Sequence, residues 1–140
     1  MILVINCIFH SNRFANSIND NNNINILDSE FNIVRHLNDW QTLVFYEADG
    51  HKTLDELTSK YSNCVIKDYN EQMIKAAEEL MNDFKIIDLW DRKENLHYCI
   101  DLPKSEHIQE EIEEFNRDIF PDNFKKLYPN WIIERFNMKF

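Results

Sequence analysis

The alternation of apolar and polar residues in the first third of the chain predicts a series of short strands. An apolar run over residues 2–9 has the length and composition of a buried strand. The polar residues 10–23 end in an asparagine cluster and predict a loop, because asparagine side chains compete for backbone hydrogen bonds. Three more strands follow, separated by turn residues, and an antiparallel meander is their simplest pairing. They cover residues 24–27, 31–37 and 42–47.

Capping residues mark the starts of the next predicted helices. Thr53 and Glu56 have the spacing of a capping box, which begins a short helix. Asp68 and Glu71 repeat this spacing ahead of a second helix, and a strand is predicted between the two helices at residues 63–67. The second helix carries an apolar stripe on one face and polar residues on the other. The stripe is Met73, Ile74, Ala77, Leu80, Met81 and Phe84, and the polar face is Glu71, Lys75, Glu78 and Asn82.

The last third of the chain predicts a hairpin followed by helix. Two strand-like runs, residues 84–90 and 95–101, flank a charged turn. Ser105 caps a third helix over residues 105–119, and residues 122–128 form one further turn or two. The third helix turns four apolar residues inward: Ile108, Ile112, Phe115 and Ile119. The apolar tail that begins at Trp131 fits a strand or a helix equally well.

Together these elements predict an α+β fold, in which about three helices pack on a mostly antiparallel sheet. The 140 residues, 44% of them hydrophobic, suffice for a single globular domain over residues 1–140. The only glycine, Gly50, follows Asp49 and predicts a turn with positive φ. A single glycine also excludes the glycine-rich phosphate-binding loops, which need at least two.

Cysteine usage indicates the compartment. The chain has an odd number of widely spaced cysteines, Cys7, Cys64 and Cys99, each in an apolar stretch, and this pattern favours free thiols in a reducing cytoplasm. The apolar run at residues 2–9 lacks the preceding basic residues of a signal peptide. No apolar segment approaches the roughly 20 residues that cross a bilayer, so we expect no membrane association.

The charge of the chain narrows the class of partner. With 15 Lys and Arg against 25 Asp and Glu, the net charge is −10, which disfavours direct nucleic-acid binding and favours a positively charged partner. In the third helix Glu106, Glu110 and Glu113 lie on one face at a spacing where like charges repel, by roughly 0.2–0.5 kcal/mol per pair. This face is either a docking surface for cations or a solvated face built from a good helix former.

Catalytic and metal chemistry find little support in the sequence. The three cysteines and five histidines carry no local signature of a nucleophile and base, and no second pair has the spacing of a zinc site. His97 and Cys99 share a strand face, but an apolar neighbourhood keeps a thiol inert. We therefore expect no enzyme activity, no catalytic residues, no cofactor and no metal ion.

In size, acidity, free-cysteine usage and Asn- and Ile-rich composition, the whole chain resembles the small acidic immunity proteins that bacteria encode beside secreted or contact-delivered toxins. The resemblance rests on no motif and transfers no residue role. It implies a cytoplasmic protein that neutralises one cognate toxin domain, often a basic nuclease, by covering its active site. In contact-dependent growth inhibition such a protein protects the cell that makes it.

The charge pattern and this resemblance lead to a predicted contact set. It combines the acidic face of the third helix with nearby acids and one aromatic anchor at a turn. The residues are Glu106, Glu110, Glu113, Glu114, Glu47, Asp49, Asp55, Glu56 and Trp40. Two other functions stay open: a nucleic-acid mimic that inhibits a DNA-binding protein, and a non-catalytic subunit or uncharacterised enzyme of a larger assembly.

Overall fold

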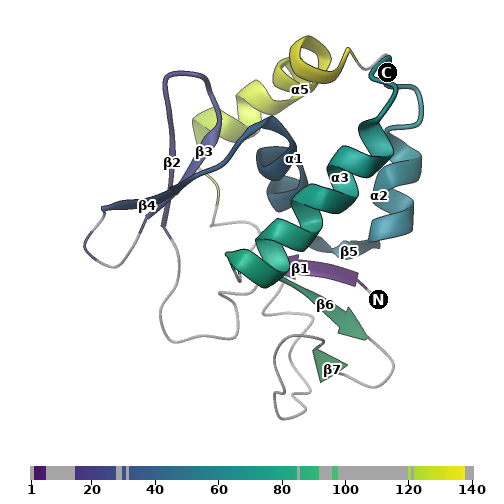
Figure 1. Cartoon of the computed structure of the whole chain (residues 1–140). Helices are drawn as coiled ribbons and strands as arrows, with labels where there is room; N and C mark the ends of the chain where they lie inside the picture. Colours follow the sequence, from purple (N-terminus) through teal and green to yellow (C-terminus); the bar gives the residue numbers. More distant parts are fainter. Residues whose placement is uncertain are drawn as a thin grey trace.

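The computed structural model describes residues 2–5, 15–27, 30, 32–84, 86–91, 96–97, 120 and 122–137. Two antiparallel sheets and four α-helices form an α+β fold in this part of the chain, as predicted (Figure 1). The larger sheet has the strand order β5-β1-β6-β7, and the smaller has the order β2-β3-β4. The third predicted helix, residues 105–119, lies outside the described residues.

The larger sheet joins segments that are far apart in the sequence. Its inner strand β1 (Ile2–Ile5) pairs with β5 (Asp49–Thr53) on one side and with β6 (Ile87–Asp91) on the other. The short strand β7 (Leu96–His97) pairs antiparallel with β6. This pairing confirms the predicted second hairpin. Gly50 has the predicted positive φ, 85°, but it lies within β5, where the pairing with β1 shifts register.

The loop predicted at residues 10–23 is wrong in part, because it contains a strand of the smaller sheet. Strand β2 (Ala15–Ile18) lies inside residues 10–23 and pairs with β3 (Ile24–Leu27), which in turn pairs with β4 (Ile33–His36). The asparagine cluster is the turn between β2 and β3. Asn19 Oδ1 accepts hydrogen bonds from the backbone amides of Asn21 and Asn23, at 2.9 and 3.0 Å. The asparagines therefore do bond the backbone as expected, but they close a hairpin instead of extending a loop.

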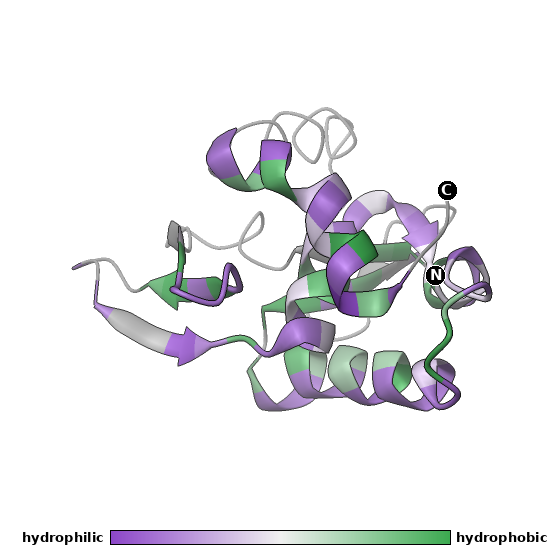
Figure 2. Ribbon diagram, turned by 90° about the horizontal axis from the view of Figure 1, so that it is seen from above, coloured by the Kyte–Doolittle hydropathy of each residue, from purple (hydrophilic) through white to green (hydrophobic). Residues whose placement is uncertain are grey.

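The strand predicted at residues 42–47 is wrong, because these residues belong to helix α1 (Asp39–Glu47). Asn38 caps this helix: its Oδ1 accepts from the amide of Gln41 at 2.8 Å, and the Gln41 side chain accepts from the Asn38 amide at 3.0 Å. Both views in Figures 1 and 2 show α1 in the middle of the molecule, with other helices on two sides. A helix surrounded in this way buries most of its circumference, so its sequence shows no amphipathic period.

Helix α2 (Leu54–Lys60) starts where the sequence predicted. The Thr53 hydroxyl accepts from the amide of Glu56 at 3.1 Å, and the Glu56 carboxylate accepts from the Thr53 amide at 3.4 Å. The strand predicted at residues 63–67 is wrong, since these residues form turns and bends between α2 and α3. Its backbone bonds are local, since the amide of Cys64 donates to the carbonyl of Tyr61 at 2.9 Å and that of Tyr69 to the carbonyl of Ile66 at 3.3 Å.

Helix α3 (Tyr69–Glu78) continues into a π-helical segment, η2 (Glu79–Asp83). The predicted polar face is exposed, at Glu71, Lys75, Glu78 and Asn82. Of the predicted stripe, Met73, Ala77, Leu80 and Met81 are buried, and Ile74 and Phe84 are half-buried. Figure 2 shows this as hydrophobic and hydrophilic residues alternating along the helix. The capping box predicted at Asp68 does not form among the described residues; its carboxylate instead accepts from the Gln72 side chain at 3.0 Å.

Helix α5 (Asp122–Phe136) unites the predicted turn at residues 122–128 and the unassigned apolar tail. It passes through Pro129, which lacks an amide to donate, and buries an aromatic face against α1. The buried residues on this face are Phe124, Tyr128, Trp131, Ile132 and Phe136.

One hydrophobic core connects the two sheets through the helices. Leu3 of β1, Ile24 of β3, Phe45 of α1, Ala77 of α3 and Trp131 of α5 all belong to the same buried cluster. No residue of this group is more than 1% exposed. The larger and the smaller sheet are therefore packed around the same helices, with α1 as the shared centre.

A polar network fixes the β2–β3 turn to two helices. Arg135 of α5 donates to Asp39 Oδ1 of α1 at 3.0 Å and also to the backbone carbonyl of Asn21. The Asn23 side chain donates to the same Asp39 oxygen at 2.9 Å. Because Asp39 lies in the first turn of α1, its negative charge also suits the helix dipole.

The capping box of α2 allows a direct test of the local signal. We expect Thr53→Ala to lower the free energy of unfolding by about 1 kcal/mol, because the amide of Glu56 loses its side-chain acceptor. Urea unfolding followed by circular dichroism measures the change. Ser59→Ala, at an exposed position of the same helix, is the control and should have little effect. Equal losses in the two variants would contradict the role of the cap.

Candidate functional site

Two carboxylates are buried in the described residues, those of Asp88 and Glu47, and Glu47, the last residue of α1, has the larger set of charged partners among the contacts seen. Glu47 is only 3% exposed. Lys60 Nζ lies 3.0 Å from both of its carboxylate oxygens, and Lys52 Nζ lies 3.1 Å from Oε2. The hydroxyls of Tyr128 and Tyr61 donate to Oε1 at 2.7 and 3.3 Å. We call these five residues the Glu47 cluster.

The Glu47 cluster brings together three consecutive elements, α1, β5 and α2, and the distant helix α5. Lys52 comes from β5, Lys60 and Tyr61 from the end of α2, and Tyr128 from α5. The two tyrosine hydroxyls also contact each other at 3.0 Å. Every partner that Glu47 needs therefore arrives through tertiary folding, with Tyr128 lying 81 residues further along the chain.

The electrostatics of the cluster keep Glu47 ionised and both tyrosines neutral. Burial alone would raise the pKa of Glu47, but the charge of Lys52 and the hydrogen bonds from Tyr128 and Lys60 lower it overall. Burial, followed by the negative charge of Glu47, raises the pKa of both Tyr61 and Tyr128. The carboxylate is thus an anion whose oxygens are already occupied, which makes it a structural anchor for α1.

An open pocket lies next to the Glu47 cluster. It has a volume of about 140 Å³ and is lined by Tyr46, Asp49, Phe120 and Lys125. Tyr46 precedes Glu47 in α1, and Asp49 Oδ2 accepts from Lys52 Nζ at 2.5 Å, so the pocket wall is attached to the cluster. The pocket combines two aromatic rings with one carboxylate and one ammonium group. Sequence reasoning included Asp49 in the contact set but missed the other three residues, because only the fold brings them together.

The structure separates the predicted contact residues into different environments. Asp55 and Glu56 are exposed in the first turn of α2, and Asp49 is half-buried in the pocket wall. Glu47 is internal, so its carboxylate is not a surface group. The reason is the pair of lysines that neutralise it, which the sequence places 5 and 13 residues away with no periodic signal. Glu106, Glu110, Glu113 and Glu114 lie outside the described residues.

Trp40, predicted as an outward anchor, is half-buried in the first turn of α1. Its ring centroid lies 4.6 Å from that of Phe136, near the end of α5. The predicted turn at residues 38–39 is the capped start of a helix, and this turns part of the indole toward the core. Part of the side chain stays accessible to solvent.

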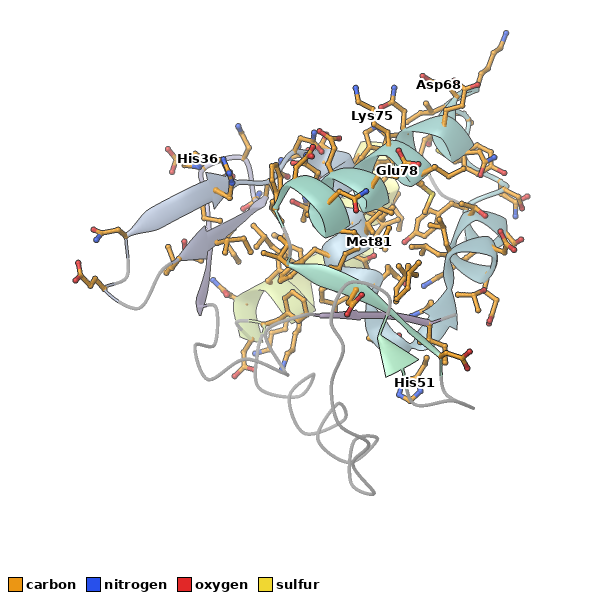
Figure 3. The ribbon with its side chains drawn as sticks, turned by 60° about the horizontal axis from the view of Figure 1, so that its bottom comes forward. His36, His51, Asp68, Lys75, Glu78 and Met81 are labelled. Carbon is orange, nitrogen blue, oxygen red and sulfur yellow. The ribbon has the colours of Figure 1, made fainter. Side chains whose placement is uncertain are left out.

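Exposed acids outnumber exposed Lys and Arg residues in the described part of the chain. Figure 3 labels two of these acids, Glu78 of α3 and Asp68 just before this helix, together with Lys75 of α3. The exposed bases are Arg35, Lys60, Lys67, Lys75 and Lys126. The exposed acids are Asp20, Glu30, Asp55, Glu56, Asp68, Glu71, Glu78, Asp83, Asp122 and Glu134.

Within the described ranges, His, Cys, Asp and Glu side chains do not form a group of three that could hold a metal ion. Of the helices in the same part of the chain, none combines the length and the apolar composition needed to span a bilayer.

Comparison of the chain with protein-family models, with curated proteins and with solved structures found no match.

Removing the charge of Glu47 should lower the stability of the protein at neutral pH. We expect Glu47→Gln to lower the free energy of unfolding by about 2 kcal/mol. This is below the 3–5 kcal/mol typical of breaking a buried ion pair, because Lys52 and Lys60 are partly exposed and regain water. Urea unfolding at pH 7 measures the loss. Glu71→Gln makes the same chemical change at an exposed position and should have little effect.

Glu47→Gln also tests how the free energy of unfolding depends on pH. Because folding lowers the pKa of Glu47 below its ordinary value of 4.5, its stabilisation is complete above that pH and is lost as the pH falls through the folded-state pKa. The gap in stability between the parent protein and Glu47→Gln should therefore narrow on acidification. A gap that stays constant from pH 7 to pH 3 would contradict the role of the ionised carboxylate.

Proposed function

We propose that this chain is an immunity or inhibitor protein that binds and neutralises a cognate, basic bacterial toxin domain. Nucleases are one class of toxin that fits this description, and the chain would inhibit its partner by covering the active site. In this proposal the protein acts in the cytoplasm of the cell that produces it, as a binding protein and not as an enzyme. The single observation that carries the proposal is the strongly negative surface.

The negative surface follows from the net charge of −10 and from where the basic groups lie. Ion pairs among the described residues engage four of the basic side chains: Lys52 and Lys60 with Glu47, Lys125 with Asp122, and Arg135 with Asp39. These four basic side chains are thus already paired with acids of the same chain. The exposed acids of α2 and α3 then create a negative potential on the outside of the molecule.

A negative surface of this kind suits a toxin that binds nucleic acid. The active site of a nuclease must attract phosphate groups, so its surroundings are basic. Carboxylates of an inhibitor can occupy the positions of those phosphates, and complementary charge accelerates the encounter of the two proteins. The inhibitor then needs no chemistry of its own, because steric exclusion of the substrate is enough.

We assign the contact surface to the predicted acidic face of residues 105–119 and to the exposed acids Asp55 and Glu56. The exposed face of α3, with Glu71 and Glu78, carries the same sign and is the competing location for the contact. Glu47 takes no direct part, because its carboxylate is buried and occupied.

Binding to a cognate toxin can be tested by co-expression. The chain should co-purify at low ionic strength with the toxin domain encoded beside its gene, and the association rate should fall steeply as salt rises. Absence of a complex at low ionic strength would overturn the proposal.

Charge reversal locates the contact. We expect Glu106→Lys, Glu110→Lys and Glu113→Lys together to slow association at least tenfold at low salt and to flatten its salt dependence, because three steering charges change sign. Stopped-flow or surface plasmon resonance measures the rates. The matched control is Glu71→Lys, Glu78→Lys and Asp83→Lys, which makes an equal charge change on exposed residues of α3 and η2. If the control slows association more, the contact lies on α3 instead.

A further inference from the structure

The smaller sheet ends in an outer strand, β2 (Ala15–Ile18), which pairs with β3 in the strand order β2-β3-β4. We call the side of β2 that faces away from β3 its outer edge. Within the described ranges, no hydrogen bond from another segment reaches this edge. The edge of an outer strand presents a row of amide and carbonyl groups that can pair with a further strand.

The hydrogen bonds of the β2–β3 hairpin show which backbone groups point outward. The amide of Asn19 donates to the carbonyl of Asn23 at 2.9 Å. Hydrogen-bonded pairs alternate with non-hydrogen-bonded pairs along an antiparallel ladder, so every second residue of β2 points its amide toward β3. The amides that point toward β3 are those of Ala15 and Ser17, and the amides that point outward are those of Asn16 and Ile18.

The other outer strands have features that hinder pairing with a further strand. β4 shows a register shift in its pairing with β3 and carries the exposed, charged Arg35. β5 shows a register shift against β1 and contains Asp49 and Lys52. β7 has only two residues. Bulges, charged side chains and short length commonly protect sheet edges, whereas β2 contains no charge or proline and its register with β3 is continuous.

The hairpin that carries β2 is fixed to the rest of the molecule. Asn19 Oδ1 accepts from two amides of the turn, and Arg135 of α5 donates to the carbonyl of Asn21. The side chain of Ile18 packs against the hydrophobic core. Figure 1 shows the hairpin at the side of the molecule, away from the larger sheet. A preformed edge loses little conformational entropy on binding, which favours its use as a contact.

Charge and geometry indicate what kind of chain would pair with the outer edge. Only an extended chain presents amides and carbonyls at the spacing of a strand. β2 itself is uncharged, but Asp20 is exposed shortly after it and the net charge of the whole chain is −10. A second copy of this chain would be repelled by the like charge, whereas a basic protein would be attracted.

We propose that an extended segment of the basic partner pairs with the outer edge of β2 and adds a fourth strand to the smaller sheet. The inference rests on the proposed function, since the partner is the basic toxin domain. Backbone hydrogen bonds to Asn16 and Ile18 fix the register between the two proteins, and the acidic surface accelerates their encounter.

Amide hydrogen exchange tests the pairing residue by residue. It is measured by NMR on the full chain, alone and with the toxin domain encoded beside its gene. In the free protein the amides of Asn16 and Ile18 should exchange faster than those of Ala15 and Ser17, which are bonded to β3. In the complex, exchange at Asn16 and Ile18 should slow roughly tenfold or more, while Ala15 and Ser17 change less.

Proline variants at neighbouring positions separate the two sides of β2. Asn16→Pro removes an outward amide and no bond to β3, so the fold should persist and binding of the toxin domain should weaken roughly tenfold. Ser17→Pro is the matched control, because it removes an amide that bonds to β3 and should lower the free energy of unfolding itself. Urea unfolding and titration calorimetry measure the two effects.

Three results would overturn the inference. They are slow exchange of Asn16 and Ile18 in the free protein, unchanged exchange of both in the toxin complex, or a dimer of the free chain that Asn16→Pro dissociates, since β2 would then pair with a second copy.

The outcome is separable from that of the proposed function. If the toxin domain binds and the outward amides of β2 are not protected, the pairing is wrong and the inhibitor role stands. If these amides exchange fast in the free protein and no toxin complex forms, the proposed function is wrong and the pairing fails with it.

Discussion

The burial of one ionised carboxylate, that of Glu47, is the constraint on which much of this structure depends. An anion taken out of water is tolerated only when cations and hydrogen-bond donors surround it. Here Lys52, Lys60, Tyr61 and Tyr128 do so, and they come from β5, the end of α2 and α5. These three elements must therefore converge on the last residue of α1 whenever the chain is folded.

This one cluster also links the stability of the fold to its surface chemistry. Lys52 and Lys60 pair with a buried acid, and exposed acids outnumber exposed Lys and Arg residues in the described part of the chain. Lys52 in turn orients Asp49, and Tyr128 supports the ring of Tyr46, so the cluster forms the back of the neighbouring pocket. Under the proposed function, a basic protein partner would contact the negative surface.

Local signals predicted the elements that depend on neighbouring residues. The capping box at Thr53, the two faces of α3, the β6–β7 hairpin and the strand Ile24–Leu27 are all confirmed. The errors occur where tertiary contacts override such signals. Residues 42–47 have strand-forming side chains but belong to helix α1. Most residues of α1 are buried, so its sequence shows no amphipathic period from which a helix could be predicted. β2 exists because β3 supplies its hydrogen-bonding partner, which residues 10–23 alone do not reveal.

The sequence by itself determined the net negative charge, the α+β class, and the start and exposed face of the best-defined helices, because these depend on composition or on residues within one turn of each other. Only the tertiary structure decided which acids are on the surface and which are internal. Glu47 and Asp55 are eight positions apart and chemically alike, yet one is buried and the other exposed. The difference lies in partners such as Tyr128, 81 residues away, and contacts over that distance leave no pattern in the sequence.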